Sequence, residues 1–407
     1  MLLVISYKKL VLTLLIIMKK ILFISQYSPE TRIVGDMIYT WDILRALKHE
    51  ERVYVHFIAY QDKEKWYENE TKKLSSLVDK VTIVPFKHLK AWQMALSLYP
   101  AAMRNRAHGN MQSAVNKILE KEHYDCIMFN TMRMAYLVNC TPTKDTKLVY
   151  ISHNIETEVS RSIYKTTHNI IQKLIYWQDY IKTAWWEKHL IKYFDAITTI
   201  CSYDANYFLN NNYKGMVKVI RPIVNLKPYD SPKQHTGKII ICGSFTWLPK
   251  KLNLNRIFDS KSIEHLVPNG CRLQVVGRTL QDDIEKGNKL PGVHVTGPVE
   301  DIKPYYEDAE VAIVPELAGG GFKLKIAEAI LHHIPIVAIK GSVTDDNMIA
   351  GIHYVEAEDF DDLIDKAISL VHNRNLQQEI TENAIKLFMD TYSIDAVNKE
   401  IQKIIGN

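Results

Sequence analysis

The chain has 407 residues, 47% of them hydrophobic and 24% charged, and its formal net charge is +5 at pH 7. These values are typical of a globular protein, and the length indicates two domains of about 200 residues each. Five excess positive charges are too few to indicate nucleic-acid binding, although they suit a phosphorylated ligand or an anionic membrane surface. The five widely spaced cysteines contain no CxxC pair, which favours reduced core residues in a cytosolic protein.

Residues 1–17 contain one apolar run, at 10–17, which lysine pairs bracket. The run is far shorter than the stretch of about twenty residues that a membrane span needs. A secretory signal would require a small-residue cleavage site, which the segment lacks. From Met18 onward the sequence is typical of a first β-strand. We therefore expect residues 1–17 to be an extension outside the fold, with a short membrane-surface anchor as the alternative.

From residue 18 to residue 225, short apolar runs alternate with amphipathic segments, which predicts an α/β domain with a parallel sheet. Gly35 stands where the loop after the first strand meets a helix, and ligands bind beyond the carboxyl ends of such strands. The expected strands are 21–25, 53–60, 81–84, 125–130, 147–152 and 195–200, and the expected helices are 37–47, 111–121 and 170–193.

Two segments of this domain are crowded with aromatic and apolar residues. Residues 85–108 are also basic, so a helix at 91–98 could face a substrate or a membrane, or could pack on the domain; we favour packing. In the helix at 170–193, apolar residues surround most of the circumference. This distribution favours a core helix over one that lies on a membrane.

His153 follows directly after the expected strand at 147–152. This position suits polar chemistry, because the carboxyl ends of parallel strands face the ligand site of such domains. The alternative is a loop histidine that bonds to nearby backbone groups. On the residues alone, both interpretations stay open.

Prolines in a polar stretch mark residues 226–237 as a linker. A second α/β series follows at 238–390, and residues 391–407 hold a last helix. The expected strands are 238–242, 272–276, 293–296, 311–314, 336–339 and 353–355, and the expected helices include 361–371, 379–389 and 394–405.

One short motif, Asp359-Phe360-Asp361, matches the Asp-x-Asp pattern of metal-dependent transferases. We interpret it as helix capping, because acidic residues are common at helix starts. The His332–His333 and Asp345–Asp346 pairs lack metal-ligand spacing, and the sequence has neither a phosphate-binding P-loop nor a GxSxG motif. We therefore expect no metal site.

The stretch from residue 311 to residue 341 predicts a strand, a glycine turn, a helix and a parallel strand. Gly319, Gly320 and Gly321 allow close approach of a ligand, and the helix start after them is an anion site. Lys323 in the first turn opposes the helix dipole unless an anion binds there, which hints at a phosphate. Glu328 lies roughly 10 Å along the axis, a spacing that suits ribose hydroxyls. The alternative is a tight turn with an exposed Glu.

The segment GGGFKLKIAEAILHHIPIVA resembles the donor-site signature of family 4 glycosyltransferases, group 1 type. The resemblance implies the GT-B fold, in which two Rossmann-like doubly wound domains face a central cleft and the last helix crosses back to the first domain. It also implies a nucleotide-diphosphate sugar as co-substrate. The donor-binding residues that it implies are Gly243, Lys250 or Lys251, Val299, Gly320, Gly321, Phe322, Lys323 and Glu328.

The segment YISHNIETE is similar to a second element of that family, whose histidine faces the donor sugar. The resemblance thus makes His153 and Glu328 the candidate catalytic residues and places Gly35 on the acceptor side. Two departures stand out. Gly320 occupies the position of a sugar-contacting glutamate, and Ser244 replaces a basic residue.

We therefore expect a glycosyltransferase that moves a sugar to a hydroxyl acceptor, without a metal and with retention as the family implies. The acceptor would be a sugar or a lipid-linked sugar in polysaccharide or glycolipid biosynthesis. The expected location is cytoplasmic, with peripheral contact at the inner face of the membrane. The alternatives are an inactive GT-B scaffold, which Gly320 and Ser244 favour, and a nucleotide-sugar epimerase.

Overall fold

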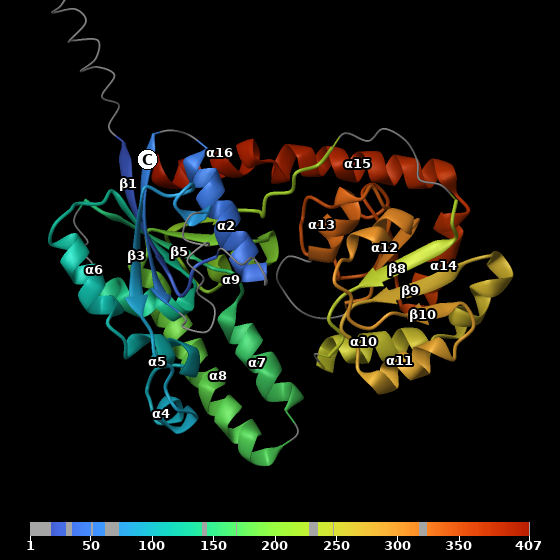
Figure 1. The fold of residues 1–407 in the computed structure, drawn as a ribbon, viewed down its shortest axis with the longest axis horizontal. Coiled ribbons are helices and arrows are strands. Elements are labelled where there is room, and N and C mark those ends of the chain that lie inside the picture. Colours follow the sequence, from blue (N-terminus) through green and yellow to red (C-terminus); the bar gives the residue numbers. More distant parts are fainter. Residues whose placement is uncertain are drawn as a thin grey trace, which may run out of the picture. The chain divides into compact units, whose positions relative to one another are not determined.

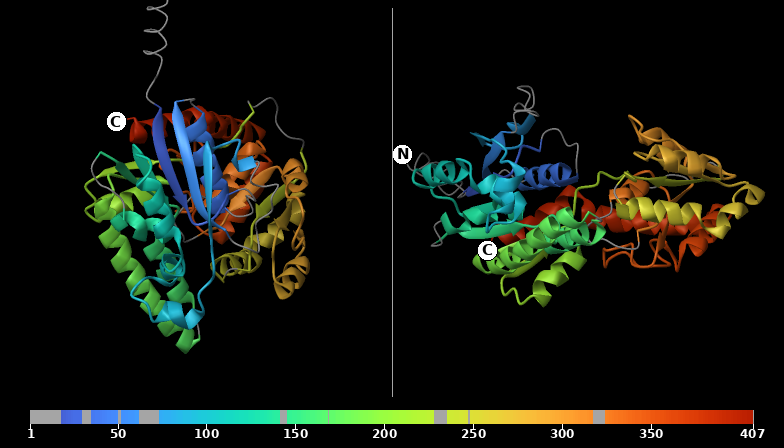
Figure 2. Two further views of the ribbon diagram at one scale, coloured as in Figure 1. Left: turned by 60° about the vertical axis from the view of Figure 1, so that its left-hand side comes forward. Right: turned by 90° about the horizontal axis from the view of Figure 1, so that it is seen from below.

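The structure is a computed structural model that describes residues 18–406 except 30–34, 50–51, 62–72, 141–144, 168, 228–234, 247 and 317–323. The described residues form two compact units. Unit 1 comprises residues up to 200, residues 204–223 and residues from 394 onward, whereas unit 2 comprises residues 201–203 and 224–393. Each unit is an α/β layer structure, as Figures 1 and 2 show. The expectation of two doubly wound parallel sheets is confirmed.

Unit 1 contains a seven-stranded sheet in which every described strand pair is parallel. The strand order reverses between β1 and β4, so this point is the topological switch where ligands of open parallel sheets bind. In sheet order the strands are β3 (Lys80–Pro85), β2 (Val53–Gln61), β1 (Lys19–Ser25), β4 (Cys126–Asn130), β5 (Lys147–Ile151), β6 (Ala196–Thr199) and β7 (Met216–Val219).

Helices cover both faces of this sheet because its strands carry apolar side chains on both sides. One face packs against α2 and α16, and the other against α5, α6, η1 and α9. The helices are α2 (Gly35–Lys48), α4 (Ala91–Ala95), α5 (Ala101–Ala107), α6 (Met111–Leu119), η1 (Met132–Cys140), α7 (Glu156–Thr166), α8 (Ile170–Leu190), η2 (Ile191–Tyr193), α9 (Ser202–Asn210) and α16 (Ile394–Ile405).

Helix α16 belongs to unit 1 although it is the last helix of the chain. Four of its side chains, from Val397 to Ile405, enter the core beside α2. The side-chain amide of Asn398 donates to the backbone oxygen of Ala46 over 2.7 Å, and Lys19 Nζ donates to the backbone oxygen of Ile405 over 2.7 Å. The C-terminal segment is therefore built into the N-terminal core.

Unit 2 contains a six-stranded parallel sheet whose order reverses between β8 and β11. Its strands, in sheet order, are β10 (Val293–Val295), β9 (Arg272–Val276), β8 (Lys238–Cys242), β11 (Val311–Val314), β12 (Ile336–Ile339) and β13 (Val355–Ala357). Its helices are α10 (Leu248–Phe258), η3 (Lys261–His265), η4 (Val267–Asn269), α11 (Gln281–Asn288), α12 (Lys303–Asp308), α13 (Leu324–Leu331), α14 (Phe360–Val371) and α15 (Arg374–Tyr392). The predicted parallel pairing of β11 with β12 is confirmed.

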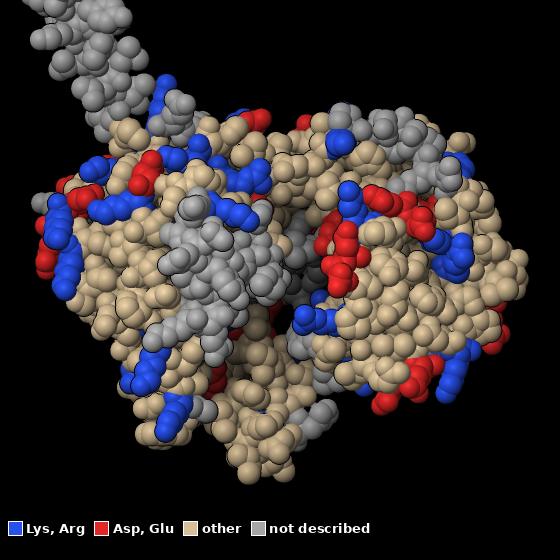
Figure 3. Space-filling view, viewed as in Figure 1, with Lys and Arg blue, Asp and Glu red and all other residues tan. Residues whose placement is uncertain are grey.

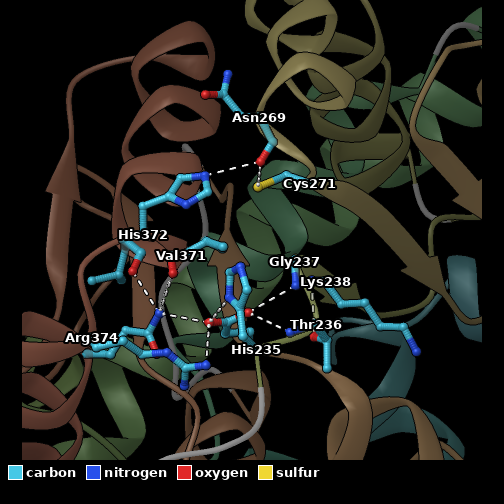
Figure 4. A network of polar contacts seen from close by, with 12 residues as sticks. His235, Thr236, Gly237, Lys238, Asn269, Cys271, Val371, His372 and Arg374 are labelled. Carbon is cyan, nitrogen blue, oxygen red and sulfur yellow. Dashed lines mark hydrogen bonds and ion pairs between the residues drawn. The ribbon is translucent and has the colours of Figure 1, made fainter.

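The entry into β8 is held by the carboxylate of Glu310, whose side chain is fully buried. Its Oε2 atom accepts hydrogen bonds from the backbone N–H groups of Thr236 and Gly237, each over 3.0 Å. Its Oε1 atom contacts His235 Nδ1 at 3.0 Å and accepts from Gln377 Nε2 over 3.1 Å. Figure 4 shows these contacts converging from the segment before β8 and from the start of α15. The network fixes where the chain enters the second sheet.

Two sequence interpretations are wrong. In α8 only Thr183, Glu187 and Leu190 are buried, so α8 is not a core helix. The apolar residues in α4 and just after it do not pack as expected either, since Trp92, Leu96 and Leu98 are all more than half exposed. In both cases apolar composition predicts burial, although composition alone does not fix which surface a helix covers. By contrast, the interpretation of Asp359 as a helix cap is confirmed, because its carboxylate accepts from the backbone N–H of Asp362 over 2.9 Å.

Candidate functional site

In unit 1, polar side chains gather just beyond the carboxyl ends of β1, β4 and β5, at the switch point of the sheet. We call them the His153 cluster: Gln26, Asp36, Asn130, Thr131, Arg133, His153 and Glu156. The strand order explains the gathering, because β4 lies between β1 and β5. Gly35, the expected acceptor-side residue, is the exposed first residue of α2, next to Asp36 of the cluster.

His153 is buried, and its Nε2 atom lies 2.7 Å from Oδ1 of Asn130. The ring of Tyr39 meets the imidazole edge-on at 5.0 Å between centroids. The Nδ1 atom is buried and has no hydrogen-bond partner among the described residues. Burial, reinforced by the charge of Arg133, lowers the pKa of His153 to about 3. The imidazole is therefore neutral at physiological pH.

The backbone beside this histidine is unusual. Thr131 adopts φ of 76°, a left-handed conformation that is rare for a β-branched residue. Its N–H donates to the backbone oxygen of Ile151 over 3.0 Å, while its buried hydroxyl has no partner among the residues described. Such strain is typical of functional sites.

Arg133, Asp36 and Glu156 are the charged residues of the His153 cluster. Arg133 Nη1 donates to Oε1 of Gln26 over 3.0 Å. Burial raises the pKa of Glu156, while Arg133 opposes that shift and Asp36 adds to it. The guanidinium of Arg133 thus lies in the His153 cluster, where burial disfavours charged groups.

Glu187 holds the segment that follows His153. Its carboxylate accepts from the backbone N–H groups of Glu156, over 3.0 Å, and Thr157, over 3.2 Å, at the start of α7. Burial raises the pKa of Glu187 to about 7. This carboxylate caps α7 from another helix, α8, and so fixes the loop that carries His153.

In unit 2, a second group of polar side chains lies at the switch point between β8 and β11. We call it the Glu328 cluster: Cys242, Lys250, Tyr306, Glu316, Lys325 and Glu328. Glu328 lies in the second turn of α13, and Tyr306 donates its hydroxyl hydrogen bond to Glu328 Oε2 over 3.1 Å. Burial raises the pKa of Glu328, although Tyr306, Lys325 and Lys250 oppose the shift.

The cations of this cluster are arranged around two carboxylates. Lys325 forms an ion pair with Glu316, which is buried and whose Oε2 atom has no partner within the described part of the chain. Burial lowers the pKa of Lys250, and the neighbouring charge of Lys325 lowers it further, whereas Glu316 and Glu328 raise it. The positive charge of Lys325 at the helix start is therefore balanced by Glu316. Lys250 is the cation that interacts with both carboxylates, Glu316 and Glu328.

The structure distinguishes the two lysines between which the sequence could not decide. Lys251 lies one residue further along α10 and pairs with Asp283 of α11 at 3.5 Å. Lys251 therefore pairs with Asp283, whereas Lys250 lies near Glu316 and Glu328. Val299 packs against the apolar cluster that contains Cys242 and Tyr306. Gly320, Gly321, Phe322 and Lys323 lie outside the described residues.

Close backbone packing shapes the strand ends beside this cluster. Gly243 follows β8, and Gly277, with φ of 122°, follows β9. A Cβ atom on Gly277 would lie 2.1 Å from the backbone oxygen of Gly243. Gly277 was missed in the sequence, although a glycine directly after a predicted strand is a recognisable sign of close approach.

Sequence reasoning also missed Asn130, Arg133 and Tyr306. Asn130 could have been found, because it ends the strand before the one that carries His153. Tyr306 could not have been found, because it belongs to α12, and nothing in the local sequence of α12 indicates its contact with Glu328 of α13.

Residues 237–373 match the model of a family described as glycosyl transferases group 1. A search of curated proteins gave no match. Among solved structures, Anabaena HepE in complex with UDP and glucose is similar with a TM-score of 0.64 at 15% identity, covering 95% of this chain and 99% of that one. S. aureus TarM in complex with Fondaparinux, alpha-GlcNAc-glycerol and UDP gives 0.64 at 13%, covering 96% and 100%.

The lipopolysaccharide outer core galactosyltransferase WaaB in its apo form gives a TM-score of 0.64 at 12% identity, covering 95% of this chain and 99% of that one. These likenesses extend over nearly the whole chain. The architecture of this protein is therefore that of the GT-B glycosyltransferases.

Proposed function

We propose that the protein is a glycosyltransferase that moves a sugar from a nucleotide-diphosphate sugar to a hydroxyl acceptor. The observation that carries the proposal is Glu328, in the second turn of α13, bonded to Tyr306 and flanked by Lys250 and Lys325. A carboxylate beside cations at a helix start suits a ribose and a diphosphate. The group 1 match covers this region, and HepE was solved with UDP-glucose.

In this proposal the donor is held without a metal. The glycine-rich segment with Gly320, Gly321 and Phe322 binds the diphosphate, while Lys323 and Lys250 balance its charge as the sugar leaves. Glu328 accepts the ribose hydroxyls, and Gly243 and Val299 border the diphosphate and the base. The co-substrate is the nucleotide sugar itself, and no further cofactor takes part.

His153 acts on the sugar. Because its Nε2 atom faces Asn130, its neutral Nδ1 atom is left to accept a hydrogen bond from a hydroxyl. It thereby orients the sugar, while Gly35 borders the acceptor. We propose retention of the anomeric configuration, a sugar or lipid-linked acceptor, a role in polysaccharide or glycolipid biosynthesis, and a cytoplasmic location.

A second candidate is a scaffold that binds the nucleotide sugar but does not react. Gly320, in place of a sugar-contacting glutamate, and Ser244, in place of a basic residue, favour it. A nucleotide-sugar epimerase is the third candidate, and it would consume the donor without an acceptor.

The test is calorimetric titration of the protein with UDP-, GDP- and ADP-sugars in excess EDTA. We expect one nucleotide to bind with micromolar affinity, and Glu328→Ala and Lys323→Ala each to weaken binding by more than about 1 kcal/mol. Absence of binding by every nucleotide, or unchanged binding in both variants, would contradict the donor site. Donor turnover with and without added acceptors then separates transferase, scaffold and epimerase.

A further inference from the structure

Helix α8 exposes more apolar surface than a helix of a closed domain should. Along it, large hydrophobic side chains are between 39% and 75% exposed. They are Ile170, Ile171, Leu174, Ile175, Tyr176, Trp177, Ile181 and Trp185. Exposed apolar surface that is contiguous in this way marks an interaction site.

The surface continues onto the segment around α4. Trp92 is 61% exposed, Leu96 81% and Leu98 86%. The indole N–H of Trp186 donates to the backbone oxygen of Leu98 over 2.9 Å, and the ring of Trp186 stacks on Tyr99 at 4.7 Å. These contacts fix the end of the α4 segment against α8. We call these three side chains and the eight on α8 the α4–α8 apolar surface.

The charged side chains beside this surface are mostly basic. Residues 85–108 include Lys87, Lys90 and Arg104 outside the core but no acidic residue. On α8, Lys173, Lys182 and Lys188 accompany just two acidic residues, Asp179 and Glu187.

Both acidic side chains are engaged by the protein itself. Asp179 accepts from the backbone N–H of Ala101 over 2.6 Å, and buried Glu187 accepts from the start of α7. In Figure 3 the end of unit 1 where α7 and α8 lie is mostly uncharged, with basic side chains and a smaller acidic area at its margin. The α4–α8 apolar surface is therefore bordered mainly by positive charge.

We propose that the α4–α8 apolar surface docks on an anionic lipid surface. Tryptophan and tyrosine favour the boundary between lipid headgroups and hydrocarbon, and lysines beside them attract anionic headgroups. A second copy of the chain fits less well, because a symmetric contact would bring two basic margins together. None of the helices that the structure describes is long and apolar enough to cross a membrane.

The test is co-sedimentation of the full chain with vesicles that contain no sugar nucleotide and no acceptor, so it is independent of the proposed function. One set is phosphatidylcholine alone, and the other is phosphatidylcholine mixed with phosphatidylglycerol. We expect at least about tenfold stronger partitioning to the anionic vesicles, weakening as salt is raised. Brominated lipids should quench tryptophan fluorescence.

The decisive variant is Ile171→Ser with Leu174→Ser, because both side chains are largely exposed and their replacement should leave the fold intact. We expect its partitioning to fall about tenfold or more. The matched control is Val267→Ser with Ile349→Ser, which removes similarly exposed apolar side chains from unit 2 and should bind like the wild type. Equal binding by all three proteins, or no binding to either vesicle, would overturn the proposal. So would a dimer in solution that Leu174→Ser dissociates, which would assign the surface to a second copy.

Discussion

The side chain of Asn130 determines which nitrogen of His153 carries the proton. Asn130 Nδ2 donates to the hydroxyl oxygens of Ser25, over 3.0 Å, and Thr40, over 2.9 Å. Both hydroxyls donate their own protons to backbone oxygens, of Tyr27 and Asp36 respectively. The amide oxygen therefore faces His153 and accepts from Nε2–H, so Nδ1 is the unprotonated nitrogen.

This arrangement predicts the titration of His153. The wild-type imidazole should stay neutral well below its ordinary pKa of 6.5, because burial lowers that pKa to about 3. In Asn130→Asp the added carboxylate favours the imidazolium and should raise the pKa markedly. Long-range ¹H–¹⁵N NMR reports both the tautomer and the pKa. His56, bonded to Tyr124 and Thr82, is the internal control and should keep its pKa of about 4. A protonated Nδ1 in the wild type would refute the assignment.

A second prediction concerns Tyr306→Phe. The change removes the hydrogen bond to Glu328 but keeps the ring, which stacks on His332 at 5.1 Å. Since that hydrogen bond lowers the pKa of Glu328, its loss should raise the pKa further. Donor binding should weaken by about 1 kcal/mol, and more at acidic pH, where Glu328 protonates. Calorimetry at two pH values measures this; a pH-independent loss would argue against Glu328 as the group involved.

Adjacent lysines of α10 offer a matched pair. Lys250→Ala removes the cation beside Glu316 and Glu328 and should weaken nucleotide-sugar binding by about tenfold. Lys251→Ala breaks a 3.5 Å pair with the buried carboxylate of Asp283, which is not part of the Glu328 cluster, and should bind the donor like the wild type. Titration of both variants with the same donor decides between them. Equal losses would mean that the diphosphate site lies elsewhere on α10.

Glu310→Gln tests the network at the entry to β8. Burial raises the pKa of Glu310, but hydrogen bonds from His235, Gln377 and two backbone N–H groups bring it below the ordinary 4.5. A carboxyl group whose pKa is lower in the folded state than in the unfolded state stabilises the fold at pH values above its unfolded-state pKa. That stabilisation is lost as the pH falls through its folded-state pKa. The variant should lose about 2 kcal/mol near pH 7, and the difference should shrink below about pH 4. Denaturant unfolding across this range measures it; a constant difference would rule out the charge as its origin.

Strand positions could be predicted closely from the sequence, because buried parallel strands are short apolar runs with clear ends. The runs at Lys238–Cys242, Arg272–Val276 and Ile336–Ile339 have the expected bounds. The strand expected at 353–355 instead occupies Val355–Ala357, since Tyr354 forms only an isolated bridge to Ala350.

The site could be predicted only where its residues share one segment of sequence. His153 and Glu328 follow recognisable strand or turn patterns. Asn130 and Tyr306 matter because separate elements bring them to those residues, and no local pattern encodes such contacts. The prediction that α8 is a buried core helix is wrong for a related reason. Apolar residues favour burial, but their pattern does not specify which element covers them.

The placement of α16 has a consequence for biosynthesis. Residues 394–405 are synthesised after nearly all the rest of this sequence. They nevertheless complete the core around α2, which is one of the first elements to be synthesised. Domains usually mature in the order of translation, N-terminal first. Here unit 1 must wait for its final helix, with the apolar side chains of α2 uncovered, whereas unit 2 has all its elements earlier. A nascent chain of this protein should therefore recruit chaperones to the N-terminal part of unit 1.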